Sequence, residues 1–152
     1  MRRPMRAATV LALAGSLLAL AVLGLEARAQ SSLRAPESVR IGLGILDEVV
    51  TDSGRLITAA DYDALPRQTE RFEAGVTALE QGLGEDSSPL RKQIEPLLAR
   101  ARVAASAMRE AASARRISML PIAHQQLADA VHALIALFPP DLRPAQAPRN
   151  IR

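Results

Sequence analysis

Apolar residues recur at helical spacing along most of the chain. Between residues 36 and 138 they repeat every three or four positions, which is the period of one face of an α-helix. Four stretches carry the pattern, at about 36–57, 61–83, 89–116 and 119–138. No stretch alternates apolar and polar residues in a run rich in β-branched side chains, as a half-buried strand does. The pattern therefore predicts an all-α domain.

Prolines and polar residues mark where these helices start and stop. Pro36 and Pro89 suit a first helical turn, where the missing N–H would be unpaired anyway, and Ser88 suits the N-cap. Pro66 indicates that the regular part of the second helix begins near Asp63. Four helices of this length with short connections favour an antiparallel up-down-up-down four-helix bundle.

Two features weaken individual helices. Gly42 and Gly44 lower the stability of the first helix by about 1 kcal/mol each relative to alanine. Either another helix passes close to these glycines, or the first helix is simply a poor one. Pro96 lies beyond the first turn of the third helix and predicts a kink there.

The start of the chain, residues 1–29, has the layout of a secretory signal peptide. Residues 1–6 contain three arginines and no acid, and residues 7–25 contain no charge. Ala27 and Ala29 then supply the small residues of an A-x-A cleavage site. We therefore expect residues 1–29 to be removed on export, so that the mature protein is periplasmic or secreted.

Cleavage after Ala29 would leave a bundle domain and a tail. The bundle would cover residues 30–140, and the proline-rich tail, residues 141–152, is expected to be disordered. The alternative is an uncleaved anchor, because the uncharged run is about long enough to span a bilayer. Only in that case would the protein be attached to a membrane.

Removal of residues 1–29 also neutralises the chain. The whole sequence has 19 Lys and Arg against 16 Asp and Glu. The removed segment contains Arg2, Arg3, Arg6, Arg28 and Glu26, so basic and acidic residues are equal in number in the part that remains. A neutral domain with two Phe, one Tyr and no Trp lacks the positive charge and the stacking rings of a nucleic-acid-binding surface. We expect no nucleic-acid partner.

The sequence carries no motif for covalent catalysis. It has no cysteine, which excludes disulfides, thiolate metal sites and covalently attached c-type haem, and it has no G-x-S-x-G stretch. We therefore expect a non-enzymatic exported bundle that acts through contacts with a protein or with the cell envelope. An apolar stripe left over at Ile41, Ile45 or Ile135 would serve a homodimer.

Acidic and basic residues are concentrated in opposite halves of the mature chain. Residues 30–90 contain eleven acids and five arginines, whereas residues 91–152 contain ten basic residues and four acids. Either the two halves pack together and attract weakly, or the uneven surface recruits a charged partner. The arginine-rich stretch 100–116 would suit an anionic lipid or an acidic protein. Its alanines permit either close helix packing or a ligand between helices.

Two histidines and one methionine are the candidate cofactor ligands. His124 falls on the inner stripe of the fourth helix, and Met108 of an antiparallel third helix should lie near it. His132 flanks the same stripe eight residues later. A His and a Met facing each other inside a four-helix bundle hold the haem of some b-type cytochromes, an analogy of fold without a shared motif. The alternative function is therefore haem or metal binding, and the competing interpretation is a core histidine bonded to the backbone.

An acidic cluster is the second candidate site for a ligand. Asp47, Glu48 and Asp52 lie near the C-terminal end of the first helix, where negative charge opposes the helix dipole. With the acids that begin the second helix, they could bind a hard cation. The sequence has neither an EF-hand loop nor the two Glu-x-x-His pairs of a di-iron bundle. The three acids thus form a candidate metal site without a recognised motif.

Overall fold

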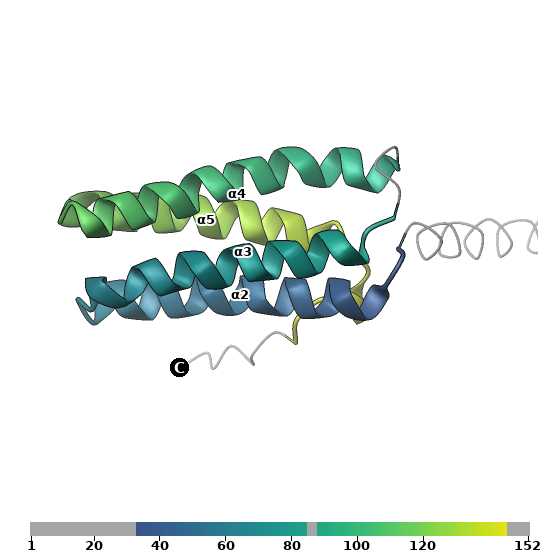
Figure 1. Cartoon of the computed structure of the whole chain (residues 1–152), viewed down its shortest axis with the longest axis horizontal. Coiled ribbons are helices and arrows are strands. Elements are labelled where there is room, and N and C mark those ends of the chain that lie inside the picture. The colour runs from purple at the N-terminus through teal and green to yellow at the C-terminus, as the bar shows by residue number, and fades with distance from the viewer. Residues whose placement is uncertain (1–32, 85–87, 146–152) are drawn as a thin grey trace, which may run out of the picture.

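The computed structural model describes residues 33–84 and 88–145, in which four α-helices pack against one another (Figure 1). The helices are α2 (Pro36–Thr58), α3 (Leu65–Gly82), α4 (Pro89–Ser113) and α5 (Leu120–Ala136), and the 3₁₀ turns are η1 (Tyr62–Ala64), η2 (Ile117–Met119) and η3 (Pro140–Leu142). Within these ranges there is no strand, only an isolated bridge between Leu33 and Leu83. The predicted all-α domain is confirmed.

Both ends of the chain lie partly outside the described residues. The expected signal peptide, residues 1–29, falls wholly outside them. No helix of the described part is long and apolar enough to cross a membrane. The expected disorder from residue 141 needs a correction, because Leu142 of η3 is buried and Arg143 Nε donates to the carbonyl of Phe138 at 2.6 Å. The folded part therefore continues past residue 140.

The helix ends follow the local chemistry of the sequence. Pro36 and Pro89 occupy the first turns of α2 and α4, and the Ser88 hydroxyl accepts the N–H of Arg91 at 3.2 Å. The second helix starts slightly later than predicted, because the 3₁₀ turn η1 precedes Leu65. Helix α4 continues through Pro96 without interruption.

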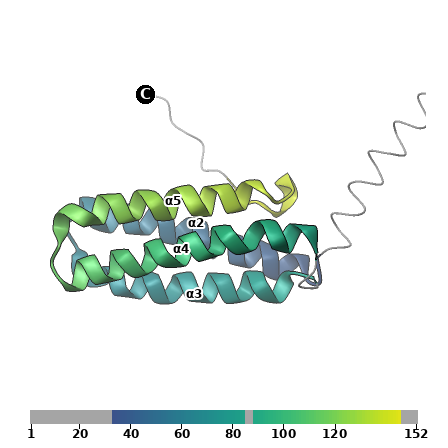
Figure 2. The ribbon, with the colours of Figure 1, turned by 90° about the horizontal axis from the view of Figure 1, so that it is seen from above.

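The four helices enclose one apolar core. Helix α2 packs mainly on α3, and α4 packs mainly on α5. The two pairs are joined by contacts of α2 with α5 and of α3 with α4, so that each helix has two neighbours (Figure 2). The largest side chains with almost no exposure include Phe72, Phe138, Leu43, Leu46, Met108 and Leu127.

Gly42 is the point at which the backbones of α2 and α3 meet. A Cβ atom at Gly42 would lie 2.6 Å from the Leu79 nitrogen and 2.8 Å from the Gly75 oxygen, well inside van der Waals contact. A Cβ atom at Gly44 would meet nothing within 4 Å. Close passage of another helix therefore explains Gly42, whereas Gly44 only weakens α2.

The second helix pair repeats the first at a constant offset in the sequence. Helices α2 and α4 end at Thr58 and Ser113, which are 55 residues apart. Helices α3 and α5 begin at Leu65 and Leu120, which are also 55 residues apart. The 3₁₀ turns η1 and η2 have the same offset. Pro66 and Pro121, in the first turns of α3 and α5, repeat at that offset too. Two positions separated by this offset, as Thr58 and Ser113 are, therefore occupy equivalent places in the two helix pairs.

The two corners also share an unusual backbone conformation. Ala60 and Arg115 have φ angles of 57° and 54°, the left-handed region that L-residues visit rarely. The next amide, Asp61 N or Arg116 N, donates to a carbonyl five residues earlier, at 2.9 Å and 2.8 Å respectively. This is the hydrogen bond of a Schellman-type helix end, built twice without glycine. The repeat thus extends to individual hydrogen bonds.

The glycine contact predicts opposite effects for two neighbouring substitutions. We expect Gly42→Ala to destabilise the protein by about 1–3 kcal/mol, because the new methyl group overlaps backbone atoms that cannot rotate away. Gly44→Ala should stabilise it by up to about 1 kcal/mol through helix propensity alone. Thermal unfolding followed by circular dichroism measures both. Equal effects of the two substitutions would contradict the close approach at Gly42.

Candidate functional site

His124 joins α5 to α2 by a hydrogen bond to the backbone. Its Nε2 lies 2.9 Å from the carbonyl oxygen of Val50, and the ring is half-buried. The carbonyl can only accept, so Nε2 donates. Gly54 makes room for the imidazole, since a Cβ atom there would lie 3.2 Å from ring atoms Cε1 and Nε2. His124 therefore acts as an interhelical contact.

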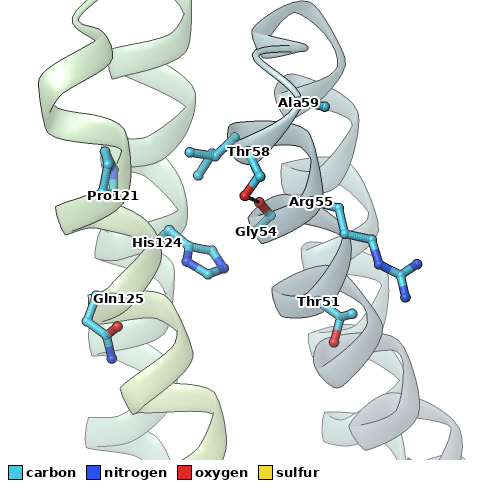
Figure 3. A pocket seen from close by; sticks show the side chains of 9 residues that line it. Thr51, Gly54, Arg55, Thr58, Ala59, Pro121, His124 and Gln125 are labelled. Atoms are coloured by element: carbon cyan, nitrogen blue, oxygen red, sulfur yellow. Dashed lines mark hydrogen bonds between the residues drawn. The ribbon is translucent and has the colours of Figure 1, made fainter. Parts of the chain in front are cut away.

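A shallow groove opens beside His124 between the end of α2 and the start of α5. Its volume is about 810 Å³, and it is largely open to solvent. The imidazole points from α5 toward α2, whereas Arg55 extends away from it (Figure 3). The hydroxyl of Thr58 donates to the carbonyl of Gly54 at 2.9 Å. The polar groups at this groove are thus partly committed to the protein itself.

The two other candidate cofactor ligands do not line this groove. Met108 is completely buried in the core on α4, and His132 is exposed on the surface of α5. The groove is lined by His124 together with residues of α2, the corner after it, and the first two turns of α5. The structure therefore places His124, Met108 and His132 in three different environments.

The acidic cluster on α2 faces an arginine of α3. Arg71 Nη2 lies 2.9 Å from a Glu48 carboxylate oxygen, and Nη1 lies 2.8 Å from an Asp52 oxygen. Nη1 also donates to the side-chain oxygen of Gln68 at 3.1 Å. Residues 33–84 and 88–145 contain no group of three or more His, Cys, Asp or Glu placed to hold a metal ion. Arg71 thus neutralises Glu48 and Asp52, two of the three acids of the candidate metal site that also includes Asp47.

Arginines of the basic half bind acids of the other half. Arg102 on α4 lies 3.1 Å from Glu80 and 3.7 Å from Glu73, both on α3. Arg115 lies 2.8 Å from Asp63 in η1. These pairs are exposed and individually weak. They nevertheless join the acidic half to the basic half, as the first interpretation of the uneven charge predicts.

An apolar surface lies on the outside of α4, α5 and the turn η2 between them. Val103 is 69% exposed, Ile122 53% and Met119 49%. Two adjoining grooves run beneath these side chains, floored by small residues such as Ala107, and Gln126 lines both. We call this surface, made of Val103, Ala107, Met119, Ile122 and Gln126, the α4–α5 apolar face.

The first helix pair carries charges where the α4–α5 apolar face is uncharged. The equivalent positions are Val103 and Glu48, Ala107 and Asp52, Gln126 and Arg71, and Ile122 and Arg67. On the first pair, three of these residues form the Arg71 ion pairs that bridge two helices. The same scaffold therefore tolerates a fully polar surface at this place. Exposed valine and isoleucine are not a requirement of the fold.

Of the three isoleucines predicted to supply an apolar stripe, only Ile41 is largely exposed. Ile41 is 50% exposed on α2, but Ile45 and Ile135 pack partly against the core. The exposed face was missed because it joins residues of two helices that are far apart in the sequence. The signal that could have revealed it was the repeat of Leu-Pro at residues 65–66 and 120–121, which aligns the two halves.

Comparison with models of protein families, with curated proteins and with solved structures finds no match to this chain. Its function has to be inferred from its own residues. The His124 groove offers one imidazole whose Nε2 is already bonded. The α4–α5 apolar face offers Val103, Ile122 and Met119, which are 69%, 53% and 49% exposed.

The hydrogen bond of His124 predicts that substitution of His124 and of His132 lowers the free energy of unfolding by different amounts. His124→Ala should lower the free energy of unfolding by about 1–2 kcal/mol, since it removes an interhelical hydrogen bond and part-buried ring contacts. His132→Ala, at an exposed position, should change it by less than about 0.5 kcal/mol. Chemical denaturation of the two variants measures the difference. Indistinguishable stabilities would show that His124 does not hold α5 on α2.

Proposed function

We propose that this protein is an exported, non-enzymatic helical bundle that acts by binding another protein through the α4–α5 apolar face. The observation that carries the proposal is the contrast between Val103 and its equivalent Glu48. Exposed apolar patches that are not demanded by the fold are typical of interaction sites, because leaving them in water is unfavourable. A partner that covers Val103, Ile122 and Met119 would remove this cost.

Two further parts of the proposal concern the architecture and the compartment. We infer an up-down-up-down order of the helices, which is supported by three short connections of equal length, at 59–64, 83–88 and 114–119. Export is supported by the basic start of the chain, the uncharged run and the A-x-A site at Ala27 and Ala29. The periplasm or the exterior is then where the partner is met.

Haem or metal binding at His124 is the alternative, and less in the structure favours it. The Nε2 atom of His124 would have to leave the Val50 carbonyl to bind a metal. Met108 lies in the apolar core and His132 on the surface. An absorption spectrum of protein purified from its host separates the two functions. A Soret band that is lost in the His124→Ala variant would favour the alternative.

Site-specific photo-crosslinking tests the proposed binding face. A photoreactive side chain at position 103 should give a protein adduct in the living host, because the partner lies against α4 there. The same group at position 48, the equivalent place on the first helix pair, is the matched control and should give little or none. Adducts absent at both positions, or stronger at position 48, would contradict binding through the α4–α5 apolar face.

Export predicts the mass of the mature protein. Cleavage after Ala29 would leave a chain that begins at Gln30, so the intact mass should be that of residues 30–152. Mass spectrometry of the protein from the envelope fraction of its host makes the measurement. A chain that begins at Met1 would show instead that the segment is retained.

A further inference from the structure

The α4–α5 apolar face carries opposite charges at its two ends along α4. Arg100 borders the groove beside Val103 and forms no ion pair with any residue of the described ranges. Glu110 borders the groove beside Ala107 and holds Arg116 at 3.8 Å. Along α4 the face therefore presents a cation, a large apolar side chain, a small one and an acid that is paired with Arg116, in that order.

These four positions are symmetric about residue 105. Arg100 and Glu110 lie equally far from it on either side, and so do Val103 and Ala107. If a second α4 is laid antiparallel across the first, Arg100 of each copy faces Glu110 of the other. Val103 of each copy then faces Ala107 of the other, so that a large side chain meets a small one.

We propose that the partner of the α4–α5 apolar face is a second copy of this chain, bound in a two-fold symmetric dimer centred between Val103 and Ala107. The inference rests on the proposed function and names its partner. A two-fold contact uses each interaction twice, which favours self-association through a self-complementary surface. Ile122 and Met119 flank the contact on the α5 side and extend the area removed from water.

The charge pattern favours a copy of this chain over a partner of a single charge sign. An acidic partner would pair with Arg100 but would meet the Glu110 carboxylate, which Arg116 approaches only to 3.8 Å, and a basic partner would meet Arg100. The first helix pair shows what an unsuitable surface looks like. Antiparallel self-pairing at the equivalent positions would bring Glu48 of one copy against Asp52 of the other, two like charges.

Sedimentation equilibrium of the protein, purified in the form in which its host contains it, provides the first test. The wild-type protein should show a concentration-dependent dimer. Val103→Glu should raise the dissociation constant of the dimer at least about tenfold, since it replaces an apolar side chain by a charge at the centre of the contact, twice per dimer. Ile41→Glu is the matched control, because Ile41 is half-exposed on α2 and outside the face. It should leave the constant unchanged, and circular dichroism checks that both variants fold.

Charge reversal provides the second test and reports the orientation. Arg100→Glu and Glu110→Arg alone should each weaken the dimer, because each places like charges together across the contact. The double variant should restore the dissociation constant to within about threefold of the wild type. Residues 100 and 110 lie about 15 Å apart along one helix, so they do not pair within a chain. Restoration therefore requires a second copy in antiparallel orientation.

The outcomes separate this inference from the proposed function. A wild-type protein that stays monomeric at every concentration, or a dimer indifferent to Val103→Glu, overturns the second copy as partner. If a photoreactive group at position 103 then yields an adduct with a different protein, the proposed function stands. If it yields none, both fail. A dimer that weakens with each single reversal and is not restored by the double variant overturns the antiparallel geometry proposed here.

Discussion

The backbone contact at Gly42 determines how closely α2 and α3 approach each other. A second glycine of α2, Gly54, leaves room for a side chain of α5. At Gly42 there is no space for a side chain between the backbones of α2 and α3. At Gly54 the missing side chain leaves room for the imidazole of His124, which then reaches the carbonyl of Val50. Helix α2 therefore contacts both of its neighbours at close range through positions that lack a side chain. The core of larger apolar residues fills the space that these contacts define.

Comparison of the two helix pairs shows which residue types the fold requires at a position and which it does not. Helix ends, left-handed corner residues and corner hydrogen bonds recur at the same offset. Most buried positions are apolar in both copies, whereas the exposed positions differ in character. At one place the first pair has Glu48, Asp52 and Arg71, and the second has the uncharged residues Val103, Ala107 and Gln126. Because helix ends and corner conformations recur at the same offset, the fold does not require apolar residues at these exposed positions.

The effect of the charged residues also depends on how the helices pack. The acids near the end of α2 oppose its dipole when α2 is considered alone, but Arg71 of α3 lies between Glu48 and Asp52 and offsets this. Arg102 likewise bridges α4 to Glu80 of α3. Such pairs add little stability each at an exposed site. Together these pairs join the acidic half of the chain to the basic half. Arg100 takes no part in them and lies at the edge of the α4–α5 apolar face.

The sequence by itself determined the helices, because periodicity, prolines and caps act within a few residues of each other. It indicated four helical segments, placed Pro36 and Pro89 in first turns, and put His124 on an inner stripe. It could not decide which groups meet across helices. That His124 bonds Val50, that Arg71 joins two acids, and that Val103 lies near Gln126 follow from the relative placement of helices. Only the tertiary structure decided these contacts, because helix periodicity specifies which face is buried but not which neighbour covers it.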